Sequence, residues 1–325
     1  MIEVTNLTKR YGDCTAVDNV SFKIRNGKIY GFLGPNGAGK STTMNIITGC
    51  LAPTEGTVSI NGYDILDNPI EAKKQIGYLP EIPPLFSDMT PLEYLTFVAE
   101  AKGVDAESVL RQVSEVMVLT GITGVRDKLI KNLSKGYKQR VGIAQTMLGN
   151  PDIIILDEPT VGLDPKQIIE IRELIRRLGQ KKTVIVSSHI LAEISAVCDH
   201  VIIMSNGKIV ADDDISCLES NVKATRNISI TVKGDMDGVR AALSSINGVS
   251  DVRFDAESSD KTPGAVQLIV TVSTADDLRD DIFFAMAEKK YAVISMEQKE
   301  MSLESIFLSL TDDTYPTKHN EEVDE

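Results

Sequence analysis

Residues 34–41 read Gly-Pro-Asn-Gly-Ala-Gly-Lys-Ser and fit the pattern G-x-x-x-x-G-K-[ST] of a phosphate-binding loop. The apolar run 28–33 before this loop is a predicted strand, and the spacing after it predicts a helix over 40–48. In that setting the loop N–H groups and the helix N-terminus bind phosphate oxygens, and the Lys40 ammonium neutralises them. The Ser41 hydroxyl is a predicted ligand of Mg²⁺. The predicted nucleotide-binding residues are Asn36, Gly37, Ala38, Gly39, Lys40, Ser41 and Thr42.

An acidic pair follows a second strongly apolar run. Residues 153–156 are all apolar and predict a buried strand that ends at Asp157 and Glu158. An enzyme with a phosphate-binding loop uses an acid at the end of such a strand for Mg²⁺, so Asp157 is a predicted metal ligand. Glu158 can accept a proton from an attacking water as a general base. Alone, this pair would simply mark a strand that enters a polar loop. Together with the phosphate-binding loop, it predicts ATP hydrolysis.

The order of the predicted elements indicates an α/β fold. Residues 1–75 contain short strands and turns, whereas residues 90–149 carry apolar residues three and four positions apart, as helices do. After these helices, strands and helices alternate up to a hairpin at Asn206-Gly207. Apolar strands between helices imply a mostly parallel sheet that is covered on both faces. We therefore expect a nucleotide-binding domain over 1–215, with a mixed sheet and a helical subdomain at about 82–150.

The sequence changes character after residue 214. Alternating and helical apolar spacings then follow one another in the order β-α-β-β-α-β, beginning with a strict alternation over 228–232. This order predicts a C-terminal α+β domain over 222–312 with a ferredoxin-like arrangement. Apolar residues at helical spacing within 303–310 predict a last amphipathic helix. The polar residues 313–325 show no periodicity and predict a disordered tail.

Charge is unevenly distributed along the chain. Acidic and basic residues are equal in number over 1–211, so the whole net charge of -13 lies in 212–325. An acidic chain argues against binding to nucleic-acid phosphates, and no nucleic-acid partner is expected. The cysteines are scattered without a C-x-x-C pair, which argues against disulfides and zinc. No apolar run reaches the roughly 20 residues of a membrane span, and no secretory signal is visible, so we expect a cytoplasmic protein.

Residues 133–140 read Leu-Ser-Lys-Gly-Tyr-Lys-Gln-Arg, which resembles the LSGGQ signature of the ATP-binding-cassette (ABC) family. Lys135 and Tyr137 stand at its third and fifth positions. Alone, the segment would read as an ordinary helix start that is capped by Ser134. It is not alone, because a segment that resembles the family's D-loop follows at 161–164 and all the motifs occur in the family's order.

The resemblance implies roles for further residues. In this family two cassettes bind head to tail around two ATP molecules, so Ser134 and Gly136 of one copy would contact the γ-phosphate bound by the other. The switch histidine, His189, would touch the same phosphate, and Asp164 would link the two sites. Tyr11 would stack on adenine. A second copy of the chain, or a homologous cassette, is therefore an expected partner.

One position departs from the family pattern. Residues 76–81 read Ile-Gly-Tyr-Leu-Pro-Glu where the family's Q-loop has a glutamine, so Glu81 is the expected metal-ligating and catalytic residue there. This version of the loop, together with the ending over 302–310, resembles ATPase subunits of two-component ABC-2 type exporters. The resemblance implies a separate transmembrane permease that binds near residues 82–100. It also implies a peripheral position on the cytoplasmic face of the cell membrane.

Other functions remain open at this point. The same motifs occur in the ATPase of an ABC importer and in soluble ABC ATPases that act on ribosomes or DNA. The second group usually has two cassettes in one chain or a long coiled coil with basic patches, and this sequence shows neither. A nucleotide sensor without turnover would have no need of Glu158 and His189. The C-terminal domain could dimerise or sense a ligand, and its acidity would hold it away from an anionic membrane surface.

Overall fold

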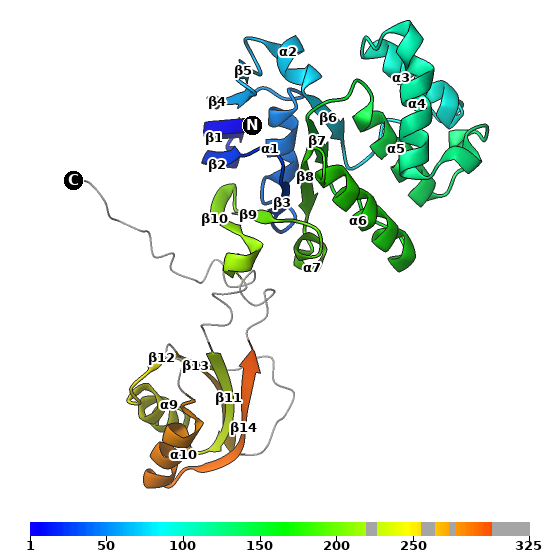
Figure 1. Cartoon of the computed structure of the whole chain (residues 1–325). Helices are drawn as coiled ribbons and strands as arrows, with labels where there is room; N and C mark the ends of the chain where they lie inside the picture. Colours follow the sequence, from blue (N-terminus) through cyan, green and yellow to red (C-terminus); the bar gives the residue numbers. More distant parts are fainter. Residues whose placement is uncertain (219–225, 255–263, 273–276, 301–325) are drawn as a thin grey trace. The chain divides into compact units, whose positions relative to one another are not determined.

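The computed structural model describes residues 1–218, 226–254, 264–272 and 277–300 (Figure 1). These residues fall into two compact units that divide at Ile215. Within the described ranges, no helix is both long and apolar enough to cross a lipid bilayer.

A six-stranded sheet lies at the centre of the first unit. Its order is β10-β9-β3-β8-β7-β6, in which β9 and β10 pair antiparallel and all other neighbours pair parallel. This mixed sheet confirms the predicted fold class. Since parallel strands end at one edge of a sheet, the loops after β3, β6, β7 and β8 meet at that edge. The strands are β3 (Ile29–Leu33), β6 (Ile76–Leu79), β7 (Ile153–Leu156), β8 (Thr183–Ser188), β9 (His200–Ser205) and β10 (Lys208–Asp214).

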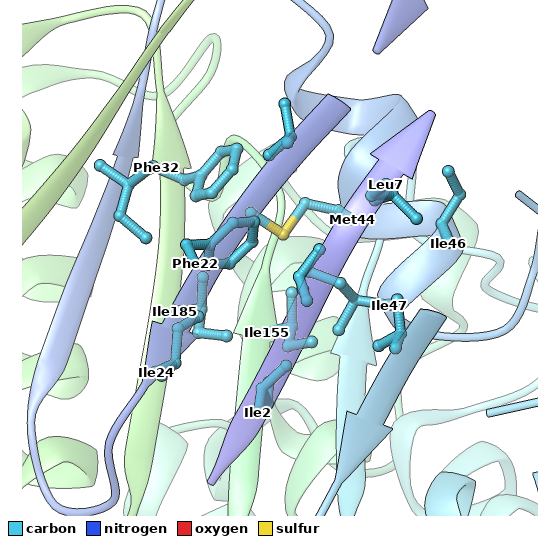
Figure 2. Close-up of a cluster of buried hydrophobic side chains, with 14 of the residues drawn as sticks. Ile2, Leu7, Phe22, Ile24, Phe32, Met44, Ile46, Ile47, Ile155 and Ile185 are labelled. Atoms are coloured by element: carbon cyan, nitrogen blue, oxygen red, sulfur yellow. The ribbon is translucent and has the colours of Figure 1, made fainter. Parts of the chain in front are cut away.

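A four-stranded antiparallel sheet, in the order β2-β1-β4-β5, shares its core with the six-stranded sheet. Helix α1 (Lys40–Ile47) supplies Met44 and Ile47 to this core, where Figure 2 shows them with Phe22 of β2 and Ile155 of β7. Because α1 begins directly after the phosphate-binding loop, burial of its apolar face fixes that loop in place. The antiparallel strands are β1 (Ile2–Tyr11), β2 (Cys14–Ile24), β4 (Glu55–Ile60) and β5 (Tyr63–Asp64).

The predicted helices are present, and polar side chains set where they begin. A capping box between Thr90 and Glu93 starts α3. The Ser134 hydroxyl accepts the Tyr137 N–H at the start of α5. The helices are α2 (Pro69–Lys74), α3 (Pro91–Ala101), α4 (Ala106–Thr120), α5 (Lys135–Met147), α6 (Pro165–Gly179) and α7 (Leu191–Ser195), with short 3₁₀ turns at Thr123–Val125 and Ile130–Asn132.

In its described residues, the second unit shows a four-stranded antiparallel sheet and the helices α9 and α10. Its strand order is β12-β13-β11-β14, the arrangement expected of a ferredoxin-like β-α-β-β-α-β chain. Ile230 at the centre of β11 and Ile282 of α10 are fully buried in a core of their own. The elements are β11 (Arg226–Lys233), α9 (Met236–Ser244), β12 (Val249–Phe254), β13 (Ala265–Val272), α10 (Arg279–Glu288) and β14 (Ala292–Glu300). The predicted helix within 303–310 and the predicted tail over 313–325 lie outside the described residues.

Tyr94 joins two helices of the helical subdomain and gives a test of its packing. Its buried hydroxyl donates a hydrogen bond from α3 to the Gln145 side chain on α5. Burial raises the pKa of Tyr94 to about 12. The folded state therefore keeps the phenol proton that the unfolded chain loses from about pH 10 upward, so this contribution to stability is lost as the pH rises from about 10 to 12.

We expect Tyr94→Phe to lower the free energy of unfolding at pH 7 by about 1 kcal/mol, because the Gln145 acceptor loses its partner. Denaturant titrations at pH 7 and at several values above pH 10 would measure this. The difference between the two proteins should shrink at high pH, since only the wild type loses this bond by deprotonation. A difference that stays constant through pH 12 would contradict the assignment.

Candidate nucleotide-hydrolysis site

The phosphate-binding loop is shaped by glycines that no other residue could replace. Gly39 has φ +102°, and a Cβ atom at this position would lie 2.5 Å from the Ala16 carbonyl oxygen. A Cβ atom at Gly34 would lie 2.4 Å from the Met204 carbonyl oxygen. The loop therefore packs directly on the backbone of β2 and β9 and leads straight into α1. This is the local structure that the motif predicts.

Lys40 lies in the loop with its side chain almost fully buried. Its Nζ donates hydrogen bonds to the carbonyl oxygens of Gly34 (2.8 Å) and Pro35 (3.2 Å) and lies 3.8 Å from Glu158 Oε1. Burial lowers the pKa of Lys40, while the charges of Glu158, Asp157 and Glu81 act in the opposite direction. The ammonium is thus held inside the loop, next to the acids at the ends of β6 and β7.

Asp157 and Ser41 lie together, as a Mg²⁺ site requires. Ser41 Oγ is 3.5 Å from Asp157 Oδ1, and the Ser187 hydroxyl donates to the same carboxylate oxygen. A hydroxyl and a carboxylate are the hard oxygen ligands that Mg²⁺ prefers. The residues present fit the ion, and phosphate oxygens would complete its coordination.

Glu158 and His189 form the most specific contact of the site. His189 Nδ1 lies 3.1 Å and 3.0 Å from the two carboxylate oxygens of Glu158, which is itself buried. The backbone of Glu158 has φ +47°, a conformation that costs energy for a residue with a side chain. Its N–H is held by the Ser187 hydroxyl at 2.8 Å. With this backbone conformation, the Glu158 carboxylate lies 3.8 Å from Lys40 Nζ.

Ser134, Gly136 and Asp164 are held apart from these contacts, at the starts of α5 and α6. Asp164 caps α6 by accepting the Gln167 N–H at 2.8 Å. A Cβ atom at Gly136 would lie 2.7 Å from the Gln167 side chain, so the two helix starts touch. In the described part of the chain, no hydrogen bond or ion pair joins Ser134, Gly136 or Asp164 to the phosphate-binding loop. This separation is what a site completed by a second copy would require.

Two further predicted residues, Tyr11 and Glu81, lie at the surface. Tyr11, at the end of β1, is half exposed, and the Lys9 ammonium lies 5.3 Å from its ring centroid. A free aromatic face of this kind can stack on a base. Glu81 follows β6 and is exposed. Among the described residues, no ion pair or hydrogen bond holds its carboxylate, so it is free to meet a metal ion or a water.

Sequence reasoning missed three polar residues of the site: Thr160, Ser187 and Glu193. Ser187 contacts Asp157 and the Glu158 backbone, as described above. Thr160 and Ser188 both donate to the Glu193 carboxylate. The one available signal was the pair of serines at the end of an otherwise apolar strand, directly before His189.

Comparison with known proteins places this site among ATP-binding cassettes. The family model for ABC transporters matches residues 17–161. The chain is 31% identical over 314 residues to the linearmycin resistance ATP-binding protein LnrL of Bacillus subtilis (strain 168), with 96% of this chain and 98% of the relative covered. It is 40% identical over 214 residues to the bacitracin transport ATP-binding protein BcrA of Bacillus licheniformis, with 65% and 69% covered.

A solved structure of similar fold contains a dimer. It is the ATP-binding cassette MJ0796 in a post-hydrolysis state bound to ADP and Pi, with a TM-score of 0.60 and 29% sequence identity. The match covers 66% of this chain and 99% of that one.

Proposed function

The chain belongs to the ABC transporter family, and from this membership we propose that it powers a two-component exporter as a head-to-tail dimer bound to a separate membrane permease. It is an ATP-binding ATPase, as the family match and the hydrolysed nucleotide in the similar cassette support. The relatives named for bacitracin transport and linearmycin resistance support export rather than import. The proposed location is the cytoplasmic face of the membrane, where ATP is available.

The contact of Glu158 with His189 beside Lys40 carries the proposal for hydrolysis. Glu158 takes a proton from water while the water oxygen attacks the γ-phosphorus, and the bond to the bridging oxygen of ADP breaks. Lys40 neutralises the phosphate oxygens, and His189 orients the base. Mg²⁺, held by Ser41 and Asp157 with Glu81 as a further candidate ligand, would supply charge neutralisation at the phosphates.

The second copy would complete each site. Ser134 and Gly136 lie at the N-terminus of α5, where free backbone N–H groups and the helix dipole favour an anion. In a head-to-tail dimer they would bind the γ-phosphate held by the other phosphate-binding loop. ATP then joins the two copies, and hydrolysis releases them. Asp164 and Tyr11 would contact the opposite copy and the adenine, respectively.

An apolar surface next to Glu81 is proposed to receive the permease. Ile82 is 83% exposed, Phe86 49% and Phe97 46%, and we call these three residues the Phe86 patch. The ring centroid of Phe86 is 5.6 Å from that of Phe97 and 5.9 Å from that of Tyr94, which ties the patch to α3. Because the loop after β6 carries both Glu81 and the start of the patch, a helix bound there would contact the loop that approaches the nucleotide.

Co-purification tests this proposal. The double variant Ile82→Glu/Phe97→Glu should recover at least about tenfold less permease from detergent extracts than the wild type, because two charges would be buried in the contact. ATP binding should be unchanged. Ile70→Glu is the matched control, since Ile70 is 65% exposed on α2 and is not one of the three patch residues, and it should retain the permease. A wild-type chain that is found without any membrane partner, or a double variant that retains it, would contradict the proposal.

A further inference from the structure

Glu193 of α7 joins the two loops that follow β7 and β8. Its Oε2 accepts a hydrogen bond from Thr160 Oγ1 at 2.6 Å and another from Ser188 Oγ at 3.1 Å. Thr160 follows Glu158 by two positions, and Ser188 directly precedes His189. A single carboxylate oxygen therefore bridges the segment with the general base and the segment with the switch histidine.

The hydroxyl groups of Thr160 and Ser188 both need a hydrogen-bond acceptor, and Glu193 supplies it. Thr160 is 6% exposed and Ser188 1% exposed, so water cannot easily replace the partner that either hydroxyl would lose. The Ser188 Oγ already accepts the Ile190 N–H at 3.1 Å, which leaves its proton for the carboxylate. A carboxylate oxygen with two lone pairs can accept both hydroxyl protons.

The bridge is not explained by capping of α7. An acidic residue in the first turn of a helix often stabilises the helix dipole or caps free N–H groups. Glu193 is in the first turn of α7, but its carboxylate accepts hydrogen bonds from the side-chain hydroxyls of two other segments. The helix has only five residues, and its buried Leu191 and Ile194 anchor it on the core, which fixes the position of this carboxylate.

The bridge also continues toward the start of α5. The Leu163 N–H donates to the Thr160 carbonyl at 3.2 Å, which connects Thr160 with the rest of 161–164. A Cβ atom at Gly162 would lie 2.2 Å from Lys135 Nζ, so this loop lies against the first residue of α5. A continuous set of contacts thus runs from the start of α5, through Thr160 and Glu193, to His189.

We infer that Glu193 is a positioning residue that couples the D-loop, residues 161–164, to His189. This inference rests on the proposed function, in which the D-loop and the start of α5 serve the site of the opposite copy while His189 serves the copy's own site. Glu193 keeps the two loops in one arrangement, so that His189 meets Glu158 only when the D-loop is correctly seated. The bridge thereby links closure at one ATP site with hydrolysis at the other.

Four variants test the bridge in the full-length protein. Thr160→Val removes the hydroxyl with little change in shape, and Thr160→Ser restores it. Glu193→Ala removes the acceptor, whereas Glu193→Gln keeps one carbonyl oxygen. We expect Thr160→Val and Glu193→Ala to lower kcat about tenfold or more with KM for ATP within about threefold, because misplaced reacting groups slow the chemical step rather than binding. Thr160→Ser and Glu193→Gln should recover most of this loss.

The Hill coefficient for ATP hydrolysis provides the second readout. It should fall toward one in Thr160→Val and Glu193→Ala, because the two ATP sites would no longer be linked. A variant that is only less stable would have a lower melting temperature and an unchanged Hill coefficient. Glu173→Gln, an exposed acid on α6 that pairs with Arg177, is the control and should behave as the wild type. Wild-type kcat and cooperativity in Thr160→Val would overturn the inference. If Glu158→Gln is also fully active, the proposed function fails instead.

Discussion

Replacement of Glu158 by glutamine should reduce phosphate release by about 1000-fold, while ATP still binds. The amide has nearly the same shape and can still contact His189, but it cannot accept the proton of the attacking water. The carboxylate lies 3.8 Å from Lys40 Nζ and 3.0 Å from His189 Nδ1, next to the loop that is proposed to hold the γ-phosphate. The steady-state rate of phosphate release and the amount of ATP that stays bound, measured on the same preparation, would test the loss of turnover and the retained binding.

The control for this variant is Glu170→Gln. Glu170 lies on α6 and pairs with Arg140, away from the phosphate-binding loop, so its turnover should remain near the wild-type value. Turnover of Glu158→Gln within about threefold of the wild type would contradict the role of Glu158 as general base. If Glu158→Gln lost ATP binding as well as turnover, the result would contradict the proposal that Glu158 acts in hydrolysis and not in binding.

Lys40→Ala should weaken ATP binding by about 100-fold, because charge-assisted contacts with the phosphates contribute about 3 kcal/mol. The loss has two causes. The phosphates lose the buried ammonium, and the carboxylates of Asp157 and Glu158 then face the triphosphate without a positive charge between them. Titration with a fluorescent ATP analogue would measure the dissociation constant.

Two controls accompany Lys40→Ala. Lys23→Ala removes an exposed lysine that pairs with Glu3 on the surface of the antiparallel sheet, and it should bind ATP as the wild type does. Lys40→Arg keeps the charge but places a larger group in a loop that packs on the backbone of β2 and β9, so it should bind poorly as well. Wild-type affinity for ATP in Lys40→Ala would contradict the assignment of Lys40 to the phosphate-binding site.

Local sequence patterns predicted much of the fold because the conformation of a short segment depends on the residue types and apolar spacing within it. The glycines and lysine of residues 34–41 require a loop between a strand and a helix, and the structure has one. Strand β7 and helix α1 were also predicted almost residue for residue, since an unbroken apolar run is a strong signal for a strand and the loop motif marks where the helix begins. In the second unit, strict alternation identified the central strand β11 and the order of the remaining elements.

The rest of the site depends on contacts between distant segments. Nothing near Glu193 in the sequence indicates that its carboxylate meets Thr160, because the two are brought together by the pairing of β7 with β8. The positive φ of Glu158 is equally invisible, since glutamate normally avoids that conformation. The start of α5 was predicted from local pattern, with Ser134 as an ordinary helix cap, but its role at a γ-phosphate was expected only from the family resemblance.

The role of the second unit, in dimerisation or in regulation, is not assigned by its fold. Its sheet and helices have a separate core, so it does not depend on the first unit for burial of its apolar residues. The net charge of -13 belongs to residues 212–325, whereas residues 1–211 are neutral overall. A role in dimerisation and a role in regulation both stay predictions, and removal of the residues after Ser220 would separate loss of dimer from altered ATPase rate.

The central claim is that ATP joins two copies of the chain into a dimer with two complete ATP sites. The mass of the Glu158→Gln variant in solution tests this claim most directly. With ATP and Mg²⁺, light scattering should give the mass of two chains, and with ADP it should give the mass of one chain. Adding Ser134→Arg, which places a large side chain where the opposite γ-phosphate would bind, should abolish the ATP-dependent dimer. An unchanged mass on replacing ADP by ATP, or a dimer that tolerates Ser134→Arg, would contradict the account.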